Sequence, residues 1–201
     1  MGATLPAAIQ RELAAHYGVD ATPDVDAFIE ASDDDGARES LLVREDDGGL
    51  EIALRLPRRG LEAGVRLGLD LAAQIVEGVS HFLCLAERAR RELPITQLEL
   101  ELQAEVDKYV TCLLVTEAIP RVSAELRARL FGDPCYEPDL DADERERYRA
   151  ANDNAHRYTT WLEHAFVAPR RIPEMLGELR RFYRVGLAGK LAQIATLSRA
   201  A

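Results

Sequence analysis

The run at residues 67–87, LGLDLAAQIVEGVSHFLCLAE, constrains the fold more than any other part of the chain. It is the longest stretch with almost no charge, and its only acids before Glu87 are Asp70 and Glu77. At 100° per residue, its large apolar side chains cover about 200° of a helix surface. A helix this apolar must be enclosed by other elements, so we expect a mostly buried central helix.

We expect this central helix to begin between Leu61 and Arg66 and to end by Leu93, because Pro94 cannot continue it. Its polar groups fall on one narrow stripe. Buried polar groups need hydrogen-bond partners, so the stripe must meet water, another helix or a pocket. It forms the candidate ligand-binding set Asp70, Gln74, Glu77 and His81.

Helical periodicity and start signals predict further helices along the chain. Thr4 and Pro6 start the first, and Gly18 ends it. Thr96 and Glu99 form the pattern of a capping box. The helices expected outside the central one cover residues 4–17, 22–31, 96–118, 121–131, 141–167 and the segment from residue 174 onward, which Gly186 and Gly189 bend or break.

One segment shows a period of two instead. Leu50, Ile52, Leu54 and Leu56 alternate with polar or small residues, and residues 40–45 precede them across a glycine-containing turn. This pattern predicts a β-hairpin. A single hairpin is only marginally stable, so its apolar face must pack on helices.

These elements predict a mainly α fold: an antiparallel bundle of about four long helices, with an N-terminal segment of two short helices and one β-hairpin. We find no repeat or linker that would divide the chain. We therefore expect a single domain over residues 1–201, in which residues 1–60 pack on a bundle formed by residues 61–201.

The composition excludes several classes of protein. The chain has 47% hydrophobic and 30% charged residues, as ordinary soluble domains do. It has no run of about 18 uninterrupted apolar residues and no secretory signal pattern, so we expect no membrane span. The three cysteines Cys84, Cys112 and Cys135 lack metal-site spacing, and their odd number argues for a reducing, cytoplasmic location.

The net charge of −10 argues against binding to nucleic acid. The charge is unevenly distributed, because residues 169–201 hold seven basic and two acidic side chains. Two interpretations stay open for this basic end: a helix docked on the acidic body of the same chain, or a patch for an anion or an acidic partner. The candidate residues of the patch are Arg180, Arg181 and Arg184.

Two kinds of chemistry are conceivable at the central stripe. Glu77 and His81 are spaced i,i+4 and reach one point, where they could bind a metal or act as an oriented base. Facing helices could add Glu101 and Glu105, or His156 and Glu163, although the last two oppose their helix's apolar face and should point to solvent. The Glu-x-x-His motif of di-iron bundles is absent, so we assign no metal ligand and no cofactor.

The sequence therefore favours a cytoplasmic, non-catalytic interaction or accessory protein whose partner is another protein or a second copy, as a homodimer. The alternative is a small-molecule or metal-binding helical-bundle enzyme with its site at Glu77 and His81.

Overall fold

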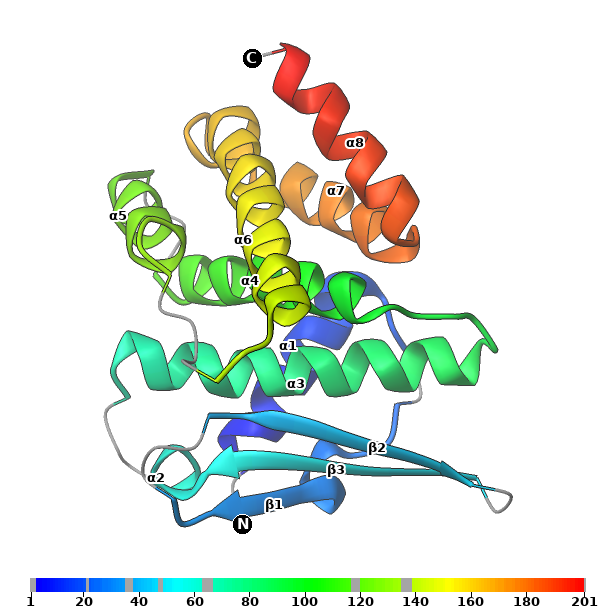
Figure 1. The fold of residues 1–201 in the computed structure, drawn as a ribbon. Coiled ribbons are helices and arrows are strands. Elements are labelled where there is room, and N and C mark those ends of the chain that lie inside the picture. The colour runs from blue at the N-terminus through cyan, green and yellow to red at the C-terminus, as the bar shows by residue number, and fades with distance from the viewer. Residues whose placement is uncertain are drawn as a thin grey trace. The chain divides into compact units, whose positions relative to one another are not determined.

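The computed structural model describes residues 3–20, 22–34, 38–46, 49–62, 67–116, 120–134 and 139–200. The chain is mostly helical with a small three-stranded sheet (Figure 1). It divides into two compact units: residues 1–15 with 19–93, and residues 16–18 with 94–201. The expectation of a single domain stays a prediction.

The first unit holds most of α1 (Leu5–Tyr17), a 3₁₀ turn η1 (Val25–Phe28), the strands β1 (Ile29–Ser32), β2 (Ser40–Asp46) and β3 (Gly49–Pro57), the short helix α2 (Arg58–Leu61) and the helix α3 (Leu69–Arg90). Thr4 caps α1 through the backbone N–H of Ala7, and Gly18 takes a φ of +63° after its end. Both predicted ends of the first helix are confirmed.

The second short helix expected at residues 22–31 is wrong. Asp24 caps the single turn η1, and the chain then continues as β1, which pairs in parallel with β3. The strand order β1-β3-β2 makes β3 the central strand, and β2 pairs with it in the antiparallel direction. Residues 29–32 form a strand because they pair with residues 54–57, which are distant in sequence. Local helix-start signals do not predict such a pairing. Residues 47–48 of the expected turn lie outside the described residues.

The core of the first unit lies between the sheet and α3, which packs along β2 and β3 (Figure 1). Leu54 and Leu56 on β3 and Ile75 and Val79 on α3 are almost fully buried. Gly78 permits this approach, since a Cβ at that position would lie 2.9 Å from the side chains of both leucines. The expected burial of the central helix is confirmed, but the helix begins at Leu69, after Gly68 in an extended conformation, and not between Leu61 and Arg66.

By length and composition α3 could cross a membrane, with a mean hydropathy of 1.3 over its most apolar window. However, 67% of that window is buried inside the structure. Core helices of soluble proteins meet the same criterion, so this is weak evidence for a span.

The second unit holds α4 (Gln97–Val115), α5 (Pro120–Phe131), α6 (Ala142–Leu162), a π-helical turn η2 (Glu163–Val167), α7 (Ile172–Arg184) and α8 (Leu187–Ala200). Asp141 begins α6 with a full capping box. The expected break near Gly186 is confirmed, because α7 ends at Arg184 and α8 starts at Leu187.

The apolar faces of α4 and α6 meet in the core of this unit, with Leu102, Val106, Tyr158 and Leu162 fully buried. The ring of Tyr158 stacks on that of Phe182 from α7, with centroids 4.0 Å apart. In Figure 1, α6 crosses α4 rather than lying alongside it. An antiparallel four-helix bundle stays a prediction.

Candidate functional site

Most of the predicted stripe on α3 is buried. Gln74, Glu77 and His81 are 3%, 5% and 9% exposed, whereas the Asp70 side chain at the start of the helix is 74% exposed. Gln74 donates a hydrogen bond of 2.8 Å to Asp70. Arg38, which precedes β2, lies 3.8 Å from the Asp70 carboxylate and 4.0 Å from that of Glu77. Within the first unit, the stripe thus meets an arginine from the segment between β1 and β2.

Glu77 and His81 lie close enough to share one partner. A Glu77 carboxylate oxygen and a His81 ring nitrogen lie within 4.8 Å of each other. Carboxylate oxygen and imidazole nitrogen are ligands of zinc and other divalent transition metals. The i,i+4 spacing on a regular helix produces this arrangement, as the sequence predicted. The pair can serve as two metal ligands or as a buried hydrogen-bonding pair.

Two of the three candidate arginines of α7 lie at the end of α1, and the third pairs with a glutamate of its own helix. The Nε of Arg180 donates to the backbone oxygen of His16 at 2.7 Å, and Arg181 forms an ion pair with Glu178 on its own helix. The Arg184 guanidinium lies beside Gly18. Cations at a helix C-terminus interact favourably with the helix dipole and the last carbonyls. Arg180 and Arg184 thus lie at the end of α1, which gives them a structural role that the sequence did not reveal.

A buried charged network in the second unit was not expected from the sequence. Lys190 of α8 is fully buried and donates to the side-chain oxygen of Gln103 at 2.6 Å. Its Nζ lies 3.9 Å from Glu99 and 5.0 Å from the ring centre of Phe182. Glu99 also accepts a hydrogen bond from the backbone N–H of Leu187. Its role therefore extends beyond the helix start, where the backbone N–H of Glu99 donates to the Thr96 hydroxyl.

The network continues from Gln103 to the end of α1. The side-chain amide of Gln103 donates to Asp107 at 2.9 Å and to the Tyr17 hydroxyl at 3.2 Å, and Tyr17 donates to Asp107. Burial and the neighbouring carboxylate of Asp107 raise the pKa of Tyr17 well above its usual value, so the phenol stays protonated. The side chains of this network are too deeply buried to contact a substrate. The network joins the end of α1 to α4 and α8.

A second polar network surrounds the π-helical turn η2. Ser123 donates to the Glu163 carboxylate, so the Tyr109 hydroxyl, 2.7 Å away, donates to Ser123. Arg127 completes the set with hydrogen bonds of 2.9 and 3.1 Å to Glu163 and one of 2.7 Å to Thr160. Burial acts to raise the pKa of Glu163, but the hydrogen bonds from Arg127 and Ser123 outweigh it and hold that pKa below its usual value.

This network corrects the expectation that Glu163 points to solvent, whereas His156 on α6 is exposed, as expected. The side chains of Arg127 and Glu163 are only 14% and 12% exposed. The His156 ring stacks on Phe131 at a centroid distance of 5.7 Å. Helix α5 covers Glu163 at the start of η2, and a contact between two helices cannot be predicted from either one alone.

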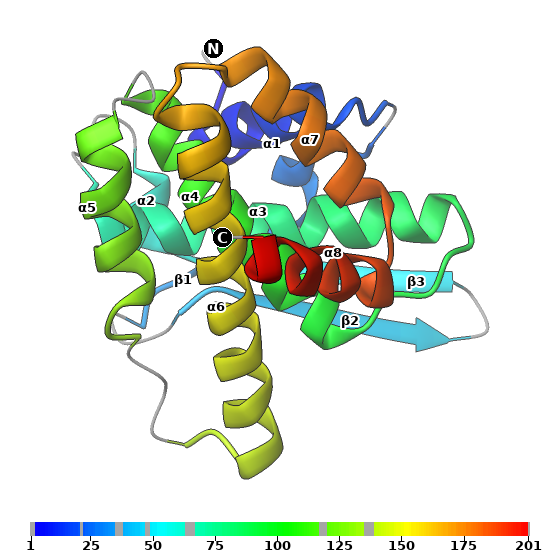
Figure 2. The same cartoon turned by 90° about the horizontal axis from the view of Figure 1, so that it is seen from above.

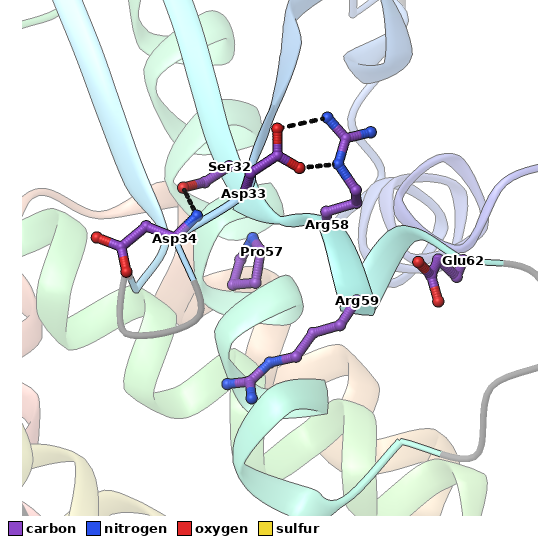
Figure 3. A pocket seen from close by; sticks show the side chains of 7 residues that line it. All are labelled: Ser32, Asp33, Asp34, Pro57, Arg58, Arg59 and Glu62. Carbon is purple, nitrogen blue, oxygen red and sulfur yellow. Dashed lines mark hydrogen bonds and ion pairs between the residues drawn. The ribbon is translucent and has the colours of Figure 1, made fainter.

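A surface pocket of about 120 Å³ lies where β1 and β3 end (Figure 3). Since the two strands are parallel, their carboxyl ends place Asp33 and Arg58 side by side, joined by an ion pair. Arg59 and Glu62 also line the pocket. Ligand sites of parallel sheets lie at this edge, but they usually enclose about 300–1,000 Å³. This pocket therefore suits at most a small polar molecule.

The described cysteines show no sign of activation. Cys84 is buried, and burial raises the pKa of Cys112, so its thiol is protonated near neutral pH. Cys135 lies outside the described residues.

Comparison of the chain with family models, with curated proteins and with solved structures found no match.

Proposed function

We propose that this chain is a cytoplasmic, non-catalytic interaction or accessory protein that associates with a second copy of itself. The proposal rests mainly on the outer edge of β2. This strand has seven residues and is paired on one side only within the described part of the chain. Unpaired strand edges are templates for pairing with another chain.

The apolar side chains of β2 support the same proposal. Leu42 and Val43 are 42% and 47% exposed, on a strand whose neighbour β3 is deeply buried at Leu54 and Leu56. The two polar networks of the second unit favour a non-catalytic role, because their charged groups are engaged with one another away from the surface. The thiols of Cys84 and Cys112 are reduced in the structure, in keeping with a reducing compartment.

Sedimentation velocity of the purified, untagged chain over roughly a hundredfold range of concentration tests self-association. We expect the average mass to rise from that of one chain toward that of two. A single-chain mass throughout the range contradicts the proposal.

The closeness of Glu77 and His81 favours a second candidate, a divalent metal site on α3. Elemental analysis of chain purified without an affinity tag tests it, with a Glu77→Gln, His81→Ala variant as the control. Metal at about one equivalent in the wild type and its loss in the variant would support this candidate. Less than about 0.1 equivalent in the wild type would reject it.

A further inference from the structure

The charge pattern along β2 limits how two copies of the chain can pair. Its first half, Leu41-Leu42-Val43, has no charge, and its first charged residue, Arg44, forms an ion pair with Glu51 across to β3. Figure 2 shows β2 along one side of the sheet. Because side chains alternate between faces, Leu41 and Val43 share the face of Leu54 and Ile52, and Leu42 lies on the other.

Two-fold symmetry limits the registers available to a pair of β2 strands. Along an edge strand, every second residue points its backbone N–H and C=O groups outward. In an antiparallel pair, two residues directly opposite each other either both point these groups at the partner strand or both point them away. A symmetric pair must therefore place one residue opposite its own copy. The residues in the middle of β2 that can take this place are Leu41, Leu42, Val43 and Arg44.

Cross-strand chemistry separates these four registers. With Arg44 at the centre, two guanidinium groups face each other and repel. With Val43 at the centre, Leu42 lies opposite Arg44, and with Leu41 at the centre, Leu42 lies opposite Ser40. Only with Leu42 at the centre does each of the three apolar residues face another apolar residue, with Leu41 opposite Val43.

We propose that two copies of this chain pair through β2 in the antiparallel direction, with Leu42 opposite Leu42. The pairing continues one sheet across both chains and covers the exposed Leu42 and Val43 side chains. It deepens the proposed function and rests on it. The occupant is a second copy because the uncharged segment matches itself in this register, as a two-fold interface requires. The edge strand β1 is shorter, with four residues, and carries Glu30 in an ion pair with Arg55.

A pairing of about five residues buries less surface than a standard interface of about 1,600 Å², so we expect a weak dimer with a dissociation constant in roughly the micromolar range. The experiment must therefore be done at high chain concentration.

Charge substitutions at Leu42 test the register. Leu42→Glu and Leu42→Lys each place like charges opposite each other, and we expect each to raise the dissociation constant of the dimer at least about tenfold. An equimolar mixture of the two variants places Glu opposite Lys and should restore the dimer. The matched control is Val115→Glu, which adds the same charge at an 80% exposed position of the second unit. Circular dichroism of each variant checks that the fold is kept.

The outcomes separate this inference from the proposed function. If the wild type dimerises and Leu42→Glu leaves the dimer unchanged, pairing through β2 is wrong while self-association stands. If Leu42→Glu tightens the dimer and Leu42→Lys weakens it, Leu42 faces Arg44 and the register is wrong. If the wild type is a single chain at every concentration, both proposals are wrong.

Discussion

Two buried tyrosines of the second unit differ in one hydrogen bond. The Tyr109 hydroxyl is bonded to Ser123, and burial raises its pKa to about 12. The hydroxyl of Tyr158 is buried and has no hydrogen-bond partner among the residues that the structure describes. We expect Tyr109→Phe to lower the free energy of unfolding by about 0.5–1.5 kcal/mol, and Tyr158→Phe to leave it unchanged or raise it by up to about 1 kcal/mol. Urea unfolding measures both, and an equal loss in the two variants would contradict this difference.

Lys190 of α8 bonds to Gln103 of α4 and lies near Glu99 of the same helix. Its ammonium group is fully buried with Gln103 and Glu99. Lys190→Met keeps much of the side-chain volume but leaves the Glu99 carboxylate buried without this cation, so we expect a loss of about 3–5 kcal/mol in unfolding free energy.

Arg157→Met is the control for Lys190→Met, because Arg157 is exposed on α6. It should change the unfolding free energy by no more than about 0.5 kcal/mol. A loss below about 1 kcal/mol in the Lys190 variant would mean that the buried cation contributes little net stability.

At the scale of elements, Glu163 joins α5 to the turn η2 through Arg127 and Ser123. Because the pKa of Glu163 is lower in the folded chain than in the unfolded one, this group stabilises the fold above the unfolded pKa of about 4.3. That stability is lost as the pH falls through the folded pKa. We expect the unfolding free energy of Glu163→Gln to depend less on pH than that of the wild type between about pH 5 and 3.

Chemical unfolding at a series of pH values measures this difference. Glu146→Gln is the control, since Glu146 is on the preceding helix α6 and is 62% exposed in an ion pair with Arg149. If the wild type and the Glu163 variant lose stability in parallel, the Arg127–Glu163 pair does not contribute to acid sensitivity.

At the scale of the whole molecule, the two compact units raise the question of cooperativity. The single-domain interpretation predicts one thermal transition, in which the calorimetric enthalpy equals the van't Hoff enthalpy. Differential scanning calorimetry at low chain concentration measures both. Two transitions, or a calorimetric enthalpy well above the van't Hoff value, would show that the units unfold separately.

Local signals predicted a large part of the elements. The caps at Thr4 and Thr96 and the break at Gly186 lie where the residues alone place them. These features depend on hydrogen bonds and backbone preferences within a few residues, so one sequence is enough to find them. The site was predicted only in part: the i,i+4 pair Glu77 and His81 is close, but Arg38 beside Glu77 comes from a segment 39 residues earlier.

The sequence by itself determined the mostly helical character, the antiparallel pairing of β2 with β3 and the burial of the apolar run at residues 67–87, because periodicity reports which face of an element avoids water. Tertiary structure alone decided that residues 29–32 form a third strand, that Lys190 is buried against Gln103, and that Glu163 meets Arg127. Each of these rests on partners distant in sequence. A charged side chain whose local pattern indicates solvent is buried only when another element brings the group that compensates it.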